Sequence, residues 1–265
     1  MNAQNLTDIG LNLTHYSFDV DREAVLNRAQ MAGVSRMLIT GSDTSHSQKA
    51  LALVKKYPNS LRSTAGVHPH HAGAVSAIDI PILRELMQQP EVLAIGECGL
   101  DYFRNFSTHE DQERVFRWQL DCAVEFRKPV FLHERDAHET FNSVVAEYRP
   151  RLVGAVAHCF TGDIAQVRNY IEMDLYVGIT GWICDERRGQ ALREAVKHIP
   201  LHRLLIETDA PYLIPRTIKP KPASHRNEPM HLTEVLKKLA LCRGESEEVI
   251  ASATTENAKR LFDWR

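Results

Sequence analysis

The chain has 265 residues, of which 43% are hydrophobic and 25% charged, and its formal net charge is −2. This is the balance of an ordinary globular protein, and it excludes a strongly basic protein that coats nucleic acid through its whole surface. The five cysteines form no CxxC pair and no apolar run reaches the ~18 residues of a membrane span, which argues against a disulfide scaffold and a membrane protein. With no signal peptide at residues 1–19, we expect a cytoplasmic protein.

Short apolar segments alternate with longer amphipathic segments along the chain. We expect strands at residues 8–13, 36–40, 62–66, 93–96, 130–132, 154–157, 175–178 and 204–206. We expect helices at residues 22–32, 45–56, 81–87, 110–126, 139–148, 164–172, 186–197, 230–243 and 246–262. This alternation predicts a parallel (β/α)8 barrel with C-terminal helices, formed as one domain from residues 1–265. No GxGxxG follows any strand, so nothing favours a dinucleotide-binding sheet.

Charged and imidazole side chains stand where several predicted strands end, in GVHPHH, IGECGLDY, FLHERDA, AHCFTG and IETDAPYL. In a barrel these ends meet at one mouth, where active sites lie. Each side chain alone could be an ordinary buried hydrogen-bonding group. Together they favour a site, because a buried unpaired polar group costs about 1–3 kcal/mol. The candidate metal ligands are Glu97, His133, His158 and Asp209.

Two imidazoles and two carboxylates suit a divalent ion such as Zn²⁺, Mn²⁺ or Mg²⁺, and such an ion could serve a hydrolase. Glu97 could bridge two metals, and Asp209 could act as both ligand and general base. We interpret His70 and His71 as structural or solvated.

The segments GVHPH, IGECGLDY, HERDA, HCFTG, GITGWICDERRG, IETDAPYL and RNEP together resemble the TatD family of metal-dependent deoxyribonucleases, over residues 8–262. The resemblance implies an amidohydrolase-like barrel that degrades DNA from the 3′ end, and it implies the same four metal ligands. It also places His68 and Arg135 near the substrate phosphate, for which a guanidinium is well suited.

The first strand departs from the family pattern. Most members carry His-x-His there, whereas this chain has Gly10 and Asn12. Asn12 can offer an amide oxygen, but Gly10 offers no ligand. We therefore expect a site that is open on the first-strand side, holds Mg²⁺ or Mn²⁺ in preference to Zn²⁺, and is completed by substrate phosphate.

Aromatic and basic residues near the mouth predict a single-stranded nucleic-acid substrate. We expect Tyr102 and Trp182 to stack on unpaired bases, worth about 1–3 kcal/mol per base, while Phe103 could equally pack within a loop. Basic residues at 187–188 and 216–226, including Arg226 and Lys221, could form a rim. Groups that bind phosphate do not distinguish DNA from RNA, so both stay open.

Two other functions compete with this one. The same barrel could hydrolyse small-molecule esters, amides or lactones, although zinc enzymes of that kind rely on the first-strand His-x-His that is missing here. It could also be a non-catalytic nucleic-acid-binding barrel, against which the four candidate ligands argue. We expect a monomer, and DNA repair or turnover as the role of the nuclease.

Overall fold

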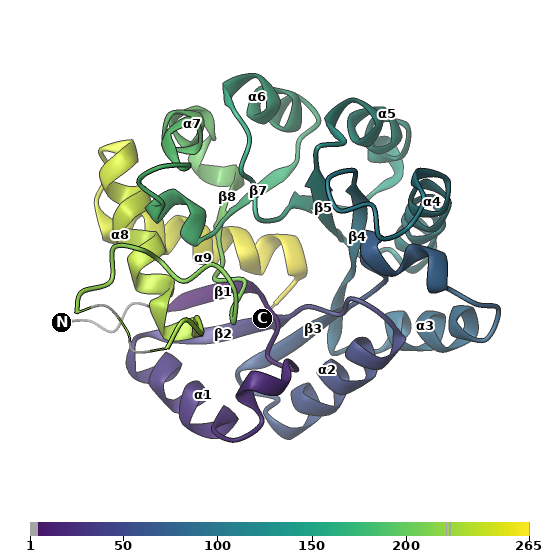
Figure 1. Ribbon diagram of the computed structural model, residues 1–265, viewed down its shortest axis with the longest axis horizontal. Coiled ribbons are helices and arrows are strands. Elements are labelled where there is room, and N and C mark those ends of the chain that lie inside the picture. The colour runs from purple at the N-terminus through teal and green to yellow at the C-terminus, as the bar shows by residue number, and fades with distance from the viewer. Residues whose placement is uncertain (1–4, 221, 223, 265) are drawn as a thin grey trace.

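The computed structural model describes residues 5–220, 222 and 224–264, and within them eight parallel strands form one sheet in the order β1 to β8. The last strand returns to the first. The backbone N–H of Asp209 donates to the carbonyl of Gly10 at 2.8 Å, and that of Asn12 donates to the carbonyl of Ala210 at 2.6 Å. The result is a nearly closed barrel with helices around it (Figure 1), which confirms the predicted fold class.

The strands are β1 (Leu6–Leu11), β2 (Val34–Ile39), β3 (Leu61–Ala65), β4 (Val92–Asp101), β5 (Val130–Arg135), β6 (Ala155–Ala157), β7 (Tyr176–Ile179) and β8 (Leu204–Ile206). The helices are α1 (Arg22–Met31), α2 (Thr44–Lys56), α3 (Asp79–Gln88), α4 (His109–Phe126), α5 (His138–Tyr148), α6 (Ile164–Glu172), α7 (Gln190–Ala195), α8 (Leu232–Arg243) and α9 (Glu247–Phe262). Every predicted strand and helix has a counterpart among them.

Two elements differ clearly from the predicted bounds. Strand β4 continues to Asp101, five residues beyond the expected end, because its last residues pair with the end of β5. The helix expected at 186–197 is reduced to α7, Gln190–Ala195, with a 3-10 turn after it. The Oδ1 atom of Asp185 accepts the N–H groups of Arg187 and Arg188, and this local turn competes with helix formation.

Alternation along the strands aims the polar side chains into the barrel. Phe131 belongs to the interior cluster, so His133, two residues later on β5, points to the same side. On β4, simple alternation from the interior residue Ala94 would turn Glu97 outward. A register shift against β5 between Ile95 and Cys98 restores its inward direction, as a bulge does beside many active sites.

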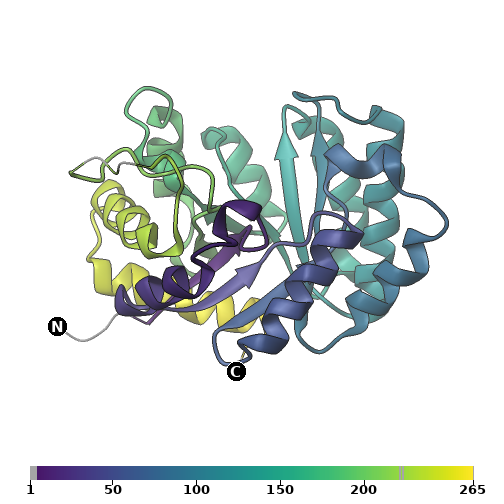
Figure 2. The same ribbon diagram turned by 60° about the horizontal axis from the view of Figure 1, so that its bottom comes forward.

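The end of α9 closes the opposite end of the barrel. Leu261, Phe262 and Trp264 are buried together with the interior residues Ile9 and Phe131. Figure 2 shows α9, in yellow, running beneath the strands. In the part of the chain that the structure describes, no helix combines the length and the apolar character needed to cross a membrane.

Candidate active site

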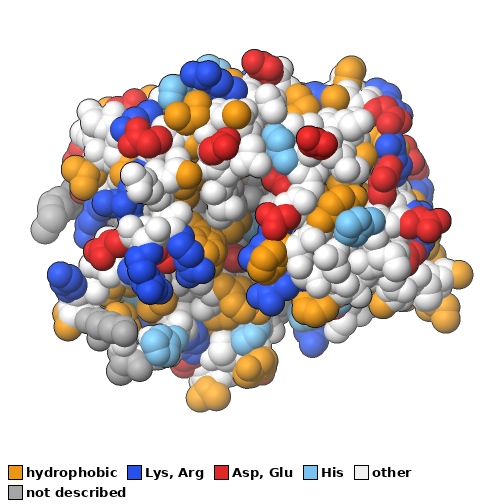
Figure 3. Space-filling view, turned by 45° about the horizontal axis from the view of Figure 1, so that its top comes forward, with side chains coloured by type: hydrophobic (Ala, Val, Ile, Leu, Met, Phe, Trp, Pro, Cys, Tyr) orange, Lys and Arg blue, Asp and Glu red, His pale blue; other side chains and the backbone are white. Residues whose placement is uncertain are grey.

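A pocket of about 720 Å³ opens at the carboxyl ends of the strands, and Figure 3 shows a hollow in this part of the surface. Eight of the nine predicted site residues line it: Asn12, His68, Glu97, His133, Arg135, His158, Trp182 and Asp209. The structure therefore brings together residues from six strand ends and from the segment after β7, over a sequence distance of almost 200 residues.

Glu97 is the centre of this pocket. Its Oε1 atom lies 2.9 Å from Nε2 of His158, 3.0 Å from Nδ1 of His133 and 3.4 Å from Nε2 of His68. His68, Glu97 and His133 each offer a ligand atom, and these three atoms lie within 4.8 Å of one another, close enough to share one ion. His68 was predicted to lie near the phosphate, and the structure places it among the groups that could hold a metal.

Burial alone would raise the pKa of Glu97, but His158 and His68 hold the pKa of this carboxyl well below its usual value. Burial would lower the pKa of His158, yet Glu97 and Glu207 raise it well above the ordinary value. Burial lowers the pKa of His68 to about 4, so this ring is neutral and free to act as a ligand. The buried Nε2 of His133 makes no hydrogen bond, as expected of a ligand nitrogen.

Glu207 fills the space on the first-strand side. Its Oε2 lies 3.2 Å from Nδ1 of His158, and its Oε1 accepts the N–H of Cys159 at 2.5 Å. A Cβ atom at position 10 would overlap this carboxylate, so glycine there makes room for Glu207. The prediction that the site is open on this side was wrong, because a carboxylate from β8 occupies the room that the missing imidazole would need. Through its contact with Nδ1, Glu207 fixes the orientation of the His158 ring.

Asp209 is fixed by the first strand. Its Oδ1 accepts a hydrogen bond from Nδ2 of Asn12 at 3.0 Å. The preceding residue, Thr208, donates its N–H to Oδ1 of buried Asp8 at 3.0 Å and its hydroxyl to Oδ2 at 2.5 Å. Burial raises the pKa of Asp209 to about 7, partly offset by His158. Asn12 thus holds the carboxylate of Asp209 through its amide nitrogen, and the offer of its amide oxygen to a cation stays a prediction.

His70 and Asp101 also belong to the site, although His70 was predicted to be structural or solvated. His70 lines the pocket, and its Nε2 lies 2.7 Å from Oδ2 of Asp101, which is 1% exposed. The same carboxylate oxygen lies 3.5 Å from Nε2 of His133. The rule that active-site residues lie at strand ends could have found the pair, because His70 follows β3 and Asp101 ends β4.

Two arginine–aromatic pairs flank the pocket. The guanidinium of Arg135 lies 3.9 Å from the ring centroid of Phe103, which is 53% exposed. On the other side, the guanidinium of Arg188 lies 4.6 Å from the ring centroid of Trp182. The expectation for Tyr102 was wrong: its ring stacks on His109 with centroids 3.6 Å apart, and it does not line the pocket. Its neighbour Phe103 takes the place at the mouth.

The predicted basic rim is only partly formed. Arg188 lines the pocket and also a smaller cavity beside it. Arg226 lines neither cavity; its two terminal nitrogens each lie 2.7 Å from a carboxylate oxygen of Asp21. Arg216 lies in that adjoining cavity. Lys221 is outside the described residues.

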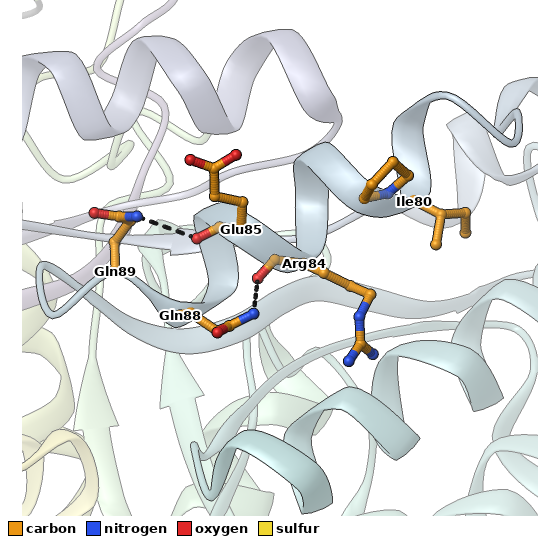
Figure 4. A pocket seen from close by; sticks show the side chains of 6 residues that line it. Ile80, Arg84, Glu85, Gln88 and Gln89 are labelled. Atoms are coloured by element: carbon orange, nitrogen blue, oxygen red, sulfur yellow. Dashed lines mark hydrogen bonds between the residues drawn. The ribbon is translucent and has the colours of Figure 1, made fainter.

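Another hollow, of about 420 Å³, lies on α3 away from the strand ends (Figure 4). Gln88 and Gln89 donate to carbonyls of their own helix at 3.1 and 3.3 Å. Arg84 pairs with Glu125 of α4. No polar groups converge on a common point there, so the catalytic candidate is the pocket at the mouth.

This chain is similar to known proteins of one family. The family described as TatD related DNase matches residues 7–263. Two relatives, each named 3′-5′ ssDNA/RNA exonuclease TatD, come from Erwinia tasmaniensis and Salmonella typhimurium. Each is 51% identical over 97% of this chain, which covers 99% and 98% of their lengths.

Solved structures of TatD-family proteins superpose on this chain over nearly its whole length. A hydrolase of the TatD family from Entamoeba histolytica superposes with a TM-score of 0.90 at 26% identity, over 98% of both chains. A TatD homologue from Escherichia coli gives 0.90 at 28% identity, over 99% of this chain and 100% of the other. The family's metal dependence fits the His68–Glu97–His133 group. The resemblance stated from the motifs is confirmed: this chain belongs to the TatD family.

Proposed function

We propose that this protein is a metal-dependent nuclease that hydrolyses phosphodiester bonds and removes nucleotides from the 3′ end of single-stranded DNA and RNA. The observation that carries the proposal is the set of three imidazoles around one buried carboxylate oxygen of Glu97, at the mouth of the barrel. The substrate and the polarity rest on the relatives, whose names describe 3′-5′ exonucleases of ssDNA and RNA.

The metal ligands in this proposal are Glu97, His133, His158 and Asp209, joined by His68. Two features support them: the buried Nε2 of His133, which makes no hydrogen bond, and the neutral ring of His68. We propose Mg²⁺ as the ion, with Mn²⁺ and Zn²⁺ as alternatives, because carboxylate and phosphate oxygens are its preferred ligands. When bound, it would polarise a phosphate oxygen and lower the pKa of the attacking water.

Asp209 has a second role beside metal binding, and further residues bind the substrate. Asp209 accepts the proton of the attacking water, and Asn12 fixes the direction of its carboxylate through the 3.0 Å hydrogen bond. Arg135 binds phosphate beside Phe103, on which a base can stack. Trp182 offers a second stacking surface across the pocket.

The test uses metal-free protein and end-labelled oligonucleotides of DNA and RNA, labelled at either end, with Mg²⁺, Mn²⁺ or Zn²⁺ added back. Mononucleotides should appear from the 3′ end only when metal is present. Asp209→Asn should lower cleavage at least about 1000-fold without unfolding the barrel, while Asp121→Asn, on the exposed surface of α4, should cleave normally. Full activity of Asp209→Asn, after a contaminating nuclease is excluded, would refute the assignment.

We also propose that residues 1–265 act as one domain, as a monomer in the cytoplasm, in DNA repair or turnover. The five cysteines are unpaired in the described structure, which suits a reducing compartment. Light scattering on the purified protein gives its mass in solution, and a dimer would refute the monomer.

A further inference from the structure

A second cavity adjoins the catalytic pocket. It has a volume of about 210 Å³ and is lined by residues at 181–188, at 213–216 and at 225. Trp182, Arg188 and Leu213 line both cavities, so the two share a wall. Resting on the nuclease function above, we propose that this groove binds the phosphate immediately 5′ of the scissile phosphate in a single-stranded substrate.

The charges of the groove suit a phosphodiester. Arg188, Arg216 and His225 line it, against one carboxylate, that of Asp185. Figure 3 shows Lys and Arg side chains gathered beside the hollow in this face. A strand that leaves the catalytic pocket on this side therefore meets an excess of positive charge on a protein whose net charge is −2.

Asp185 orients the guanidiniums of Arg188 and Arg216 but contacts only one nitrogen of each. It is 5% exposed, and its Oδ2 lies 3.3 Å from Nε of Arg216 and 3.5 Å from a terminal nitrogen of Arg188. The arginine side chains themselves are 46% and 63% exposed. Because a guanidinium carries five N–H donors, most donors of both residues stay available to a phosphate.

The wall between the cavities is a firm surface. A Cβ atom on Gly181 would overlap the carbonyl oxygen of Leu213, so the two loops touch through their backbones. The ring of Trp182 is held on this wall beneath the guanidinium of Arg188. A base can stack at this position while its phosphate reaches the arginines, which is how proteins hold single strands without reading sequence.

The direction follows from the reaction. A 3′-to-5′ exonuclease keeps one nucleotide on the 3′ side of the cut, and the rest of the strand extends 5′ across the surface. The groove continues the pocket beyond Trp182, so it can receive this longer part. The terminal nucleotide then lies on the other side, towards Phe103 and Arg135.

The test compares a thymidine dinucleotide with its 5′-phosphorylated form, which carries the extra phosphate. The full chain with Mg²⁺ should prefer the phosphorylated form by about tenfold in kcat/KM, the effect of one charge-assisted contact. Arg216→Ala should reduce this preference to about twofold or less, and Arg216→Lys should keep part of it. Arg168→Ala, an exposed arginine of α6 that lines neither cavity, should keep all of it.

The outcomes separate the two proposals. No preference in the unaltered protein, or a full preference in Arg216→Ala, overturns the groove and leaves the nuclease intact. Absence of metal-dependent cleavage of both dinucleotides and of a longer single strand overturns the nuclease itself. Thermal unfolding of each variant shows that a lost preference does not come from a lost fold.

Discussion

Gly10→Ala tests whether position 10 of β1 must lack a side chain to leave room for Glu207. The new Cβ would overlap Oε2 of Glu207 and lie 3.0 Å from the ring of Phe131. Glu207 is fully buried and bonded to His158 and Cys159, so it cannot move without losing a partner. Overpacking costs about 1–3 kcal/mol, and one lost charge-assisted hydrogen bond about 1.5–3 kcal/mol. We expect a loss of about 2.5–6 kcal/mol in the free energy of unfolding.

Urea unfolding measures this loss, and Gly73→Ala is the matched control. A Cβ at Gly73 would meet only ordinary contacts, the nearest at 3.5 Å, so this variant should unfold within about 0.5 kcal/mol of the unaltered protein. Glu207→Asp draws the carboxylate back and should couple favourably with Gly10→Ala by about 1 kcal/mol. A Gly10→Ala protein as stable as the control variant, with no coupling to Glu207→Asp, would show that the space behind His158 is not filled as described.

Three further predictions concern the site and its supports. Burial raises the pKa of Asp8 from 3.8 to about 7, so the stability that this carboxyl contributes is present below about pH 4 and is lost as the pH rises through about 7. Urea unfolding at about pH 5 and about pH 8 should therefore show that the unaltered protein loses stability over this range relative to Asp8→Asn. Phe103→Leu should raise KM for single-stranded DNA about 5- to 100-fold, whereas Tyr102→Leu should not, and the reverse order would contradict the stacking role. Arg226→Ala removes two hydrogen bonds to partly exposed Asp21 together with those to the Ser17 carbonyl and Glu228, and it should cost about 1–2 kcal/mol on thermal unfolding; an unchanged midpoint would mean that this set of contacts contributes nothing.

The fold was predictable because the barrel repeats one simple pattern. Each apolar strand is followed by an amphipathic helix, and parallel neighbours in sequence are neighbours in space. The end of β4 was not predictable in this way. Apart from Leu100, its last residues at 97–101 are polar or small, and they remain a strand because the end of β5 pairs with them. Pairing between strands is a tertiary contact, which local periodicity does not record.

The site was predictable as a set of residues but not as a set of contacts. The strand-end rule found Glu97, His133 and His158, since it needs only the positions of the strands. It could not choose between Tyr102 and Phe103, because one residue of displacement on a loop decides which ring faces the pocket. The rule also did not predict why residue 10 is glycine: the carboxylate of Glu207, 197 positions away in the sequence, occupies the space of a side chain there.

Phe131 divides the interior of the barrel into two compartments. Its ring lies 4.8 Å from the ring of His158 above, and it packs with Phe262 and Trp264 in the cluster below. Phe131 therefore forms an apolar floor beneath His158, and charges beside such a floor interact more strongly than they would in water. The residues that pack with Phe131 in the lower cluster lie away from the pocket, so substitutions there are expected to act through stability, whereas substitutions in the pocket change the residues that meet a substrate.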